Sequence, residues 1–586
     1  MCGIFGYVGV ERSVPLTVGA ALKSLEYRGY DSWGIVWREA DRLETIKKIG
    51  RVPTSFTFDA VSRIAVGHTR WATHGGVTDA NAHPHLDSTG RVAIVHNGII
   101  ENAGELRGRL KHAPPYLSET DSEIVAHLLG ECVAAGDSIV DALRSIFPLL
   151  EGQNAVIAID QRDEVIAAAM NVSPLVIGIG EQGAFISSDP FALVGKASEM
   201  VIVPNEAIVR LDPVRVRAFS YAGVELPMPD RHPVPDISLD EIGDHSHFMT
   251  KEMAEQPGVL RDQIDDVESA ARLAAHIERA EHVILTGCGS AFYAARIGST
   301  WLSKLSGKRT VAVSASEFDE VAPFLNERTL VIAITQSGET ADILEAMRTA
   351  LSGGSPVVAL VNVTHSSAAR LADDVIPLMA GRERSVLATK SLLAMLSRLL
   401  TSAFIVSGAP ERATPSLTRA AQTIENLSLS EDFAADIVRI SEIIAKSEHV
   451  FIIGKGDGYG VAQEAALKIK EASYIHAEAF AAGELKHGAI ALIEPGVPCL
   501  AFASDPQFLT DTGTSMQELR SRGGYTIGIG LDVGEGACQK LVIADHGPAN
   551  VLVHIFVAQQ IAFHVALLRH VDPDYPRNLA KSVTVK

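Results

Sequence analysis

The second residue of the chain is a cysteine, Cys2, which is followed by Gly3 and a short apolar run. If the initiator methionine is removed, this residue carries both a thiol and a free α-amine. The amine has an ordinary pKa of about 7.7–8.0, so it can accept the thiol proton near neutral pH. Cys2 is therefore a candidate N-terminal nucleophile for attack on a carbonyl carbon, although a cysteine at this position is by itself most often incidental.

Six sequence blocks strengthen this interpretation because they occur in a fixed order within the first 123 residues. They span residues 1–6, 26–32, 68–74, 81–85, 96–102 and 118–123. Together they resemble the N-terminal domain of class II glutamine amidotransferases. The resemblance implies that Cys2 attacks the side-chain amide of glutamine and releases ammonia.

The residue types in these blocks suit amide hydrolysis. The reaction passes through an oxyanion that needs preorganised donors, and the resemblance assigns this role to Asn97 and Gly98. Free glutamine also presents a carboxylate, which Arg70 can bind through two N–H groups, and an ammonium, which Asp121 can pair with. The resemblance adds four further residues to the glutamine pocket: Trp71, Thr73, His74 and His83.

Two loops later in the chain are candidate phosphate sites. Residues 287–290 (Gly-Cys-Gly-Ser) and 335–340 (Thr-Gln-Ser-Gly-Glu-Thr) each follow an apolar run and precede a helical pattern. Backbone amides at a helix N-terminus, together with hydroxyl groups, can hold a phosphate without a basic residue. The second loop resembles the phosphosugar loop of sugar isomerase (SIS) domains. The predicted sugar-phosphate contacts are Ser290, Thr335, Gln336, Ser337, Thr340 and Lys468.

Lys468 and Glu471 are three residues apart on a predicted helix, so they share one face. From spacing alone, a solvated ion pair is the simpler explanation. However, residues 466–476, 482–488 and 576–585 resemble blocks of the glutamine–fructose-6-phosphate transaminases, and the resemblance then spans nearly the whole chain. It implies that Glu471 moves a proton between C1 and C2 of the open-chain sugar, that His487 assists ring opening and that Lys581 forms a Schiff base with the ketose. Lys468 then orients the sugar.

The implied substrates are L-glutamine and a ketose 6-phosphate, with fructose 6-phosphate favoured, and the implied products are glutamate and glucosamine 6-phosphate. No cofactor and no metal are implied. Three positions depart from the family pattern: Thr335 replaces a serine but keeps a hydroxyl, whereas Ala291 and Ala388 each stand where the family carries a hydroxyl. A lost buried hydrogen bond costs about 0.5–1.5 kcal/mol. The same chemistry on a different ketose phosphate, or a non-catalytic SIS protein that senses a sugar phosphate, therefore stays open.

Two kinds of scaffold are needed to position these residues. Before residue 228 the sequence has short strand-like runs with helical patterns at 13–26 and 120–135, whereas later residues alternate strands and helices. The strand, glycine turn and helix at 282–305 recur at 449–473, which indicates a duplicated unit with a parallel sheet. We therefore expect an Ntn-type αββα glutaminase domain (2–226), a proline-rich linker (227–246), two doubly wound SIS domains (247–410 and 430–571) and a C-terminal tail (572–586) that completes the sugar site.

The amino-acid composition limits the kinds of partner that we expect the protein to bind. The 586 residues carry a formal net charge of −20, which disfavours binding to nucleic acid or to an anionic membrane. The longest apolar run, 551–568, contains two histidines and two glutamines, so it predicts a buried helix and not a membrane span. Five scattered cysteines without metal-ligand spacing, and the lack of a signal-peptide pattern, predict a cytoplasmic protein. The family resemblance implies a homodimer.

Overall fold

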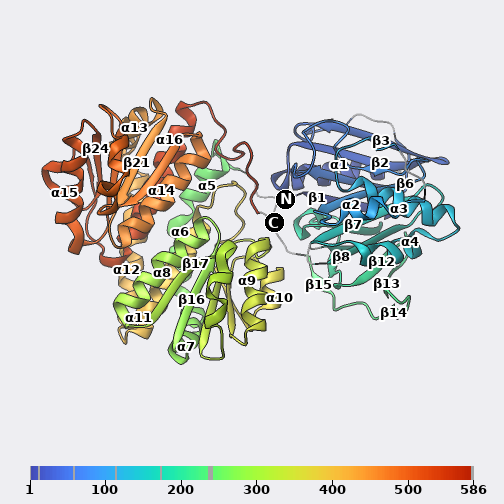
Figure 1. The fold of residues 1–586 in the computed structure, drawn as a ribbon, viewed down its shortest axis with the longest axis horizontal. Coiled ribbons are helices and arrows are strands. Elements are labelled where there is room, and N and C mark those ends of the chain that lie inside the picture. Colours follow the sequence, from blue (N-terminus) through green and yellow to red (C-terminus); the bar gives the residue numbers. More distant parts are fainter. Residues whose placement is uncertain are drawn as a thin grey trace. The chain divides into compact units, whose positions relative to one another are not determined.

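The computed structural model describes residues 2–10, 13–56, 60–111, 115–171, 175–234 and 242–582. The chain divides into two compact units (Figure 1). The first comprises Met1–Asp240 with Ala580–Lys586, and the second comprises Glu241–Leu579. Each unit is described separately below.

The first unit contains two antiparallel sheets. One has the strand order β15 (His232–Pro233), β11 (Glu199–Ile202), β9 (Val176–Gly180), β10 (Gly183–Ser187), β1 (Gly3–Gly9), β4 (Ile64–Arg70), β2 (Ser32–Glu39) and β3 (Arg42–Ile49). The other has the order β14 (Glu225–Leu226), β13 (Val216–Ser220), β12 (Ala207–Leu211), β8 (Ile166–Asn171), β7 (Asn154–Asp160), β6 (Val92–Gly98) and β5 (His85–Leu86).

Helices cover the outer face of each sheet, which confirms the predicted αββα arrangement. Strand β1 explains the layering, because successive side chains of a strand point to opposite faces. Phe5 and Tyr7 pack with α1 (Val14–Leu25), whereas Ile4 and Val8 pack between the two sheets. On the far side, α3 (Glu123–Ala134) and α4 (Ile139–Ile146) cover the second sheet, and the short helix α2 (Ala103–Arg107) precedes them.

Part of the predicted linker belongs to this unit. We expected the four prolines of 226–235 to exclude a strand, but β15 pairs with β11, with Met200 opposite His232. The pairing is possible because β15 is an edge strand. Proline has no N–H to donate, and on an edge strand that position can face away from the neighbouring strand. The expectation that this whole segment lies outside the sheets is therefore wrong.

The second unit contains two five-stranded sheets in which every neighbouring pair is parallel. The first has the order β17 (Arg309–Ser314), β16 (His282–Gly287), β18 (Thr329–Thr335), β19 (Val357–Val361) and β20 (Asp374–Pro377). The second has the order β22 (His476–Ala481), β21 (His449–Gly454), β23 (Pro498–Ala503), β24 (Tyr525–Gly530) and β25 (Gln539–Val542). Both copies follow the order second, first, third, fourth, fifth strand, so the predicted duplication is confirmed.

Most helices of this unit share one apolar core with both sheets. They are α5 (Phe248–Ala254), α6 (Gln256–Asp265), α7 (Val267–Arg279), α8 (Ser290–Ser306), α11 (Lys390–Val406), α12 (Ala413–Ser428), α13 (Glu431–Ala445), α14 (Asp457–Ser473) and α16 (Asn550–Leu568). Helix α15 (Leu509–Arg520) packs in a separate apolar cluster of the second sheet, and α9 (Ala341–Ser352) and α10 (Ser367–Leu371) belong to the first copy. Among the described residues, only the 547–568 segment is long and apolar enough to span a membrane, and 78% of it is buried inside the fold. The predicted buried helix is confirmed.

In each copy the strand order reverses between the first and third strands. In an open parallel sheet, the loops that leave these two strands diverge and form a crevice at the carboxyl edge. In the first copy these loops are 287–290, after β16, and 335–340, after β18. The topology therefore brings the two predicted phosphate loops to one edge.

Candidate functional site

Cys2 lies at the start of β1, beside the ends of β4 and β6. The backbone N–H of Trp71 donates to its Sγ over 3.2 Å, and the Asn97 side-chain amide donates to its carbonyl oxygen over 3.0 Å. Asn97 is a predicted oxyanion donor and Trp71 a predicted glutamine contact. The structure therefore brings two predicted site residues to the candidate nucleophile.

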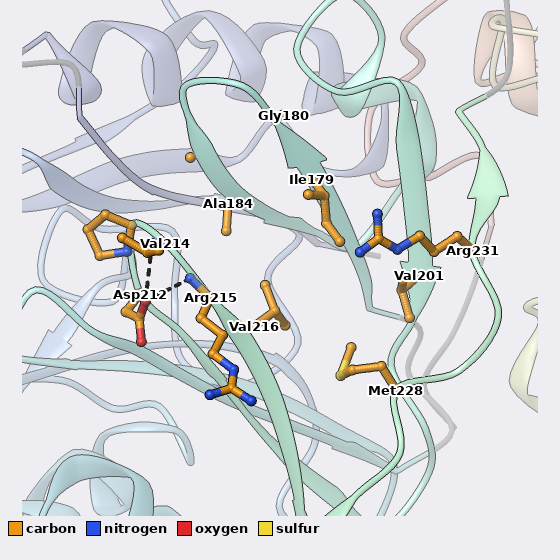
Figure 2. Close-up of a pocket in the computed structure, with 12 residues that line it drawn as sticks. Ile179, Gly180, Ala184, Val201, Asp212, Val214, Arg215, Val216, Met228 and Arg231 are labelled. Carbon is orange, nitrogen blue, oxygen red and sulfur yellow. Dashed lines mark hydrogen bonds between the residues drawn. The ribbon is translucent and has the colours of Figure 1, made fainter.

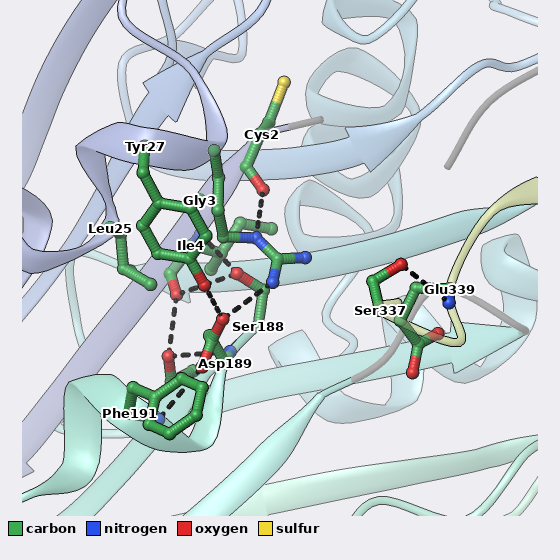
Figure 3. Close-up of polar contacts among 12 residues, drawn as sticks. Cys2, Gly3, Ile4, Leu25, Tyr27, Ser188, Asp189, Phe191, Ser337 and Glu339 are labelled. Atoms are coloured by element: carbon green, nitrogen blue, oxygen red, sulfur yellow. Dashed lines mark hydrogen bonds and ion pairs between the residues drawn. The ribbon is translucent and has the colours of Figure 1, made fainter. Parts of the chain in front are cut away.

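A buried ion pair fixes the backbone of Cys2 from the other side. Arg28 donates through Nε to the Cys2 carbonyl oxygen over 3.3 Å and pairs with Asp189 over 2.9 Å. The Tyr27 hydroxyl donates to the same carboxylate (Figure 3). Because Arg28 and Asp189 are both buried, the pair is rigid and holds the cysteine in one orientation.

The electrostatics at Cys2 favour the neutral thiol. Burial raises the pKa of the Cys2 thiol, while the Trp71 N–H and the Arg70 guanidinium oppose this shift. A buried thiol with a raised pKa needs a base to become the nucleophilic thiolate. If Met1 is removed, the α-amine of Cys2 would supply that base.

Gly98 ends β6 next to Asn97, and its backbone requires glycine. Its φ is +137°, and a Cβ here would lie 2.1 Å from the carbonyl oxygen of Gln153. Two residues further on, the Ile100 N–H donates to Asp121 over 2.7 Å. The predicted anion for the glutamine ammonium is thus tied to the strand end that carries the predicted oxyanion donors.

Arg70 holds the loop 71–76 in this structure. Its guanidinium donates to the carbonyl oxygens of His74, Gly75 and Gly76 over 2.5, 3.3 and 3.2 Å. Thr73 and the His74 side chain are exposed on this loop. Arg70 therefore shapes the loop that carries the predicted glutamine contacts, in addition to its predicted contact with a carboxylate.

Three further residues brace the same loop, and the sequence analysis gave them no role. Asp31 accepts the Ala72 N–H over 2.9 Å, and Glu119 accepts the Gly76 N–H over 3.2 Å. Asn81 donates to both the Gly76 carbonyl and Glu119. All three lie inside the matched sequence blocks, so their position there was the only signal for them.

His83 is buried within a group of histidines. Its ring centroid lies 4.2 Å from that of His68 and 4.4 Å from that of His85, and His96 completes the group. Burial lowers the pKa of His68 to about 3 and holds the pKa values of His83, His85 and His96 below the usual range. The predicted glutamine contact His83 therefore lies in an uncharged packed cluster, with only 4% of its surface exposed.

In the second unit, the loop 335–340 is a tight turn ending at the N-terminus of α9. Thr335 accepts the Gly338 N–H over 3.1 Å, and Ser337 accepts the Glu339 N–H over 3.2 Å (Figure 3). Gln336 lies between these turn residues, and Thr340 is the N-cap residue of α9, without a side-chain capping bond. Gly338 has φ +69°, and a Cβ there would lie 2.0 Å from the Ser366 hydroxyl.

A buried charge network lies beside the other phosphate loop. Ser290 donates to Glu464 over 2.9 Å, and Lys468 pairs with Glu464 over 3.3 Å and with Glu471 over 2.6 Å. Burial, which outweighs the attraction of Lys468, raises the pKa of Glu464 to about 7. Burial opposes ionisation of Lys468 as well, but its two carboxylates outweigh burial and raise its pKa. Ser290, Lys468 and Glu471 are thus brought together as predicted.

The sequence analysis did not single out Glu464 as a site residue. It lies one helical turn before Lys468 on α14, so the spacing could have indicated it, but its contact with Ser290 depends on how α14 packs against α8. Glu252 and Glu383 were missed as well. They accept hydrogen bonds from residues 384–391, the segment that contains Ala388.

Two further predicted catalytic residues belong to other segments of the chain. His487 is exposed on the 3-10 turn Glu484–His487, and its ring makes no hydrogen bond or ion pair with the described residues. Lys581 belongs to the C-terminal residues grouped with the first unit. Their predicted contribution to the sugar site is taken up below as a proposal.

The first unit also contains a cavity of about 320 Å³, which is distinct from the candidate glutamine site (Figure 2). It is lined by apolar side chains such as Ile179 and Met228, with Arg215 and Arg231 at its edge, and none of the predicted site residues lines it. Within the described part of the chain, no group of three or more His, Cys, Asp or Glu side chains is placed to hold a metal ion.

Comparison of the chain with known protein families gives the same division into two kinds of domain. Residues 1–219 match the glutamine amidotransferase domain, and residues 276–405 and 443–569 each match the SIS domain. Fold and sites together thus define a glutamine amidotransferase joined to a pair of SIS domains.

Relatives that match the chain over its full length show which family of glutamine amidotransferases it belongs to. A glutamine–fructose-6-phosphate aminotransferase [isomerizing] from Symbiobacterium thermophilum is 37% identical over 614 residues, and one from Thermococcus kodakarensis is 36% identical over 613, each match covering 100% of both chains. The chain belongs to this family, the isomerizing glutamine–fructose-6-phosphate aminotransferases. A solved C-terminal domain of glucosamine-fructose-6-phosphate aminotransferase from Francisella tularensis matches 57% of this chain and 100% of its own, with 27% identity and a TM-score of 0.51.

Proposed function

We propose that this protein transfers the amide nitrogen of L-glutamine to fructose 6-phosphate and isomerises the product to glucosamine 6-phosphate, releasing L-glutamate. Full-length membership of the family carries this proposal, and the two separate polar sites support it. A different ketose 6-phosphate is the second candidate, favoured by the two missing hydroxyls at Ala291 and Ala388.

In the glutaminase half, the thiolate of Cys2 attacks the amide carbonyl of glutamine, and the donors of Asn97 and Gly98 stabilise the oxyanion. Collapse of this intermediate releases ammonia and leaves a thioester, which water hydrolyses to glutamate. Arg70, Trp71, Thr73, His74, His83 and Asp121 form the glutamine pocket. The 3.0 Å contact from Asn97 to Cys2 and the braced 71–76 loop support this assignment.

In the sugar half, hydroxyl and amide groups of Ser290, Thr335, Gln336, Ser337 and Thr340 bind the phosphate. Lys581 forms a Schiff base with the ketose, and ammonia then displaces the lysine. Glu471 moves the proton from C1 to C2, with Lys468 orienting the sugar and His487 assisting ring opening. The buried contact between Lys468 and Glu471 supports these roles, because it holds the carboxylate in place.

The assembly is also part of the proposal. We infer a cytoplasmic homodimer in which a neighbouring subunit completes the sugar site, and the exposed position of His487 supports this. We propose domain boundaries at 2–226, 247–410 and 430–571 and a functional tail at 572–586, with 227–246 as a connecting segment whose residues 232–233 join the sheet of the first unit as β15.

Reciprocal variants test the division into two half-reactions. Cys2→Ala should abolish glutamate release but leave binding of fructose 6-phosphate unchanged, because the nucleophile acts only on the amide. Lys468→Met should lower amino-sugar formation at least 100-fold, roughly the cost of losing an orienting charged group, and leave glutamine binding intact. Glutamate release, amino-sugar formation and calorimetric binding are measured on the same preparations. Persistent glutaminase activity in Cys2→Ala would contradict the nucleophile assignment.

A further inference from the structure

The two copies of the parallel-sheet domain carry matching helices, and their N-terminal turns have the same geometry. Helices α8 and α14 are each 17 residues long and follow the first strand of their copy. Their N-cap glycines, Gly289 and Gly456, have φ of 55° and 59°, with ψ of −127° in both. Counting from these glycines, Ser290 corresponds to Asp457, Trp301 to Lys468 and Lys304 to Glu471.

Each crevice is therefore formed by loops of one copy and a helix of the other. In the first copy, the loop residue Ser290 meets Glu464 of α14, next to Lys468. In the second copy, the equivalent loop residue is Asp457, and it meets Trp301 and Lys304 of α8.

The second crevice is filled by the chain's own ion pairs. Asp457 is buried, and it accepts the Trp301 Nε1–H over 3.0 Å and lies 3.4 Å from the Lys304 ammonium. Asp505 follows β23, as the 335–340 loop follows β18, and pairs with the same ammonium over 2.7 Å. A neighbouring lysine, Lys455, pairs with Asp511. The second copy thus carries a carboxylate, Asp457, at the loop position where the first copy carries the hydroxyl of Ser290, and a carboxylate at that position repels a phosphate.

Helix α14 connects Asp457 to the charges that face Ser290, and it packs closely against α8. A Cβ on Gly460 of α14 would lie 2.3 Å from Ile297 of α8, so the two backbones approach closely at that point. Glu464 and Lys468 occupy the next two turns of α14. The same helix therefore carries Asp457 at its first turn and the charges that face Ser290 further along.

We propose that Asp457 takes the place in the second crevice that a sugar phosphate takes in the first, and that its bonds to Trp301 and Lys304 position α14 for the sugar reaction. Each chain then binds one sugar phosphate. Asp457 is a positioning residue, because it acts through Lys468 and Glu471 and touches no substrate. This inference rests on the function proposed above.

The test compares four variants at Asp457 and its neighbourhood in the full-length protein. Asp457→Ala removes both contacts, so kcat for amino-sugar formation should fall roughly tenfold or more while KM for fructose 6-phosphate changes less than about threefold. Asp457→Asn keeps an acceptor for Trp301 and should restore most of kcat. Asp511→Ala, which removes a neighbouring exposed carboxylate, should leave kcat unchanged. Trp301→Phe removes the donor to Asp457 but keeps an aromatic ring in the core, and it tests the same link if Asp457→Ala does not fold.

Glutamine hydrolysis, measured on the same samples, should be unchanged in every variant. A folded Asp457→Ala enzyme with wild-type kcat, or a folded Trp301→Phe enzyme with wild-type kcat where Asp457→Ala does not fold, would overturn the positioning role. Calorimetry with fructose 6-phosphate should give one site per wild-type chain, and two sites would overturn the proposal. If the wild-type protein binds fructose 6-phosphate once but forms no amino sugar, the proposed function fails and the single-site part of the inference stands.

Discussion

Four buried imidazoles lie on or next to the strands that carry Arg70 and Asn97. Those of His68 and His96 belong to β4 and β6 themselves. Burial lowers the pKa of every member of the group, His68 to about 3, so all four are neutral at pH 7. The ordinary histidine pKa is about 6.5, so the unfolded chain binds more protons than the folded chain between roughly pH 3 and 6.5. The free energy of unfolding of this unit therefore rises with pH across that window and falls on acidification.

Replacing His83 with phenylalanine should weaken this pH dependence. His83→Phe keeps an aromatic ring between His68 and His85 but removes one group that protonates only after unfolding. We expect the slope of unfolding free energy against pH to decrease by up to about 1.4 kcal/mol per pH unit between pH 4 and 6. Urea titrations followed by tryptophan fluorescence measure it, because Trp33, Trp37 and Trp71 lie in this unit. The exposed His245→Phe serves as the control, and equal slopes for His83→Phe and wild type would contradict the account.

The chemistry of single residues was largely predictable, but their packing was not. Cys2, Asn97 and Asp121 stand in sequence blocks whose residue types suit amide hydrolysis, and the structure places them around one strand end. Glu464 and Asp457 were not predicted, because their partners Ser290 and Trp301 lie more than 150 residues away on another helix. Such contacts depend on tertiary packing, which local spacing does not encode.

At the scale of elements, strands with both faces buried were the easiest to predict. β6 and β16 each contain an uninterrupted apolar segment, 92–95 and 283–285, as expected for strands covered on both sides. The hairpin of β2 and β3 was missed because β3, with the sequence RLETIKKI, is rich in charged residues. It forms the edge of its sheet, where exposed positions favour such side chains. Helix α12 was also missed, since it lies in the interval 411–429 that the predicted domains left unassigned.

The phosphate loop offers a sharp test at this scale. Gly338→Ala would place a Cβ 2.0 Å from the Ser366 hydroxyl and force the turn between β18 and α9 to move. Gly354→Ala is a matched control, because Gly354 has a similar φ of +79° but no atom within 4 Å of its Cβ. Both variants should lose about 1 kcal/mol or more of stability from the positive φ. Only Gly338→Ala should weaken fructose 6-phosphate binding at least tenfold by calorimetry, and equal affinities would contradict the loop's proposed role.

At the scale of the whole molecule, two folds of different origin serve two half-reactions. The antiparallel αββα unit presents a nucleophile at a strand end, and the duplicated parallel sheets present crevices at their carboxyl edges. The net charge of −20 is compatible with an anionic substrate, because the proposed phosphate contacts are hydroxyl and amide groups backed by one buried lysine. In the second crevice the carboxylate of Asp457 replaces the hydroxyl that Ser290 supplies in the first, which gives the duplicated unit a single proposed sugar site.

The central claim is that one chain moves the glutamine amide nitrogen onto a ketose 6-phosphate. Wild-type protein is incubated with glutamine labelled with ¹⁵N at the amide, separately with fructose 6-phosphate and with other ketose phosphates, and the products are identified by mass spectrometry. The account predicts ¹⁵N-labelled glucosamine 6-phosphate with fructose 6-phosphate, formed in equal amount to glutamate. Label found only in free ammonia with every ketose phosphate would contradict it.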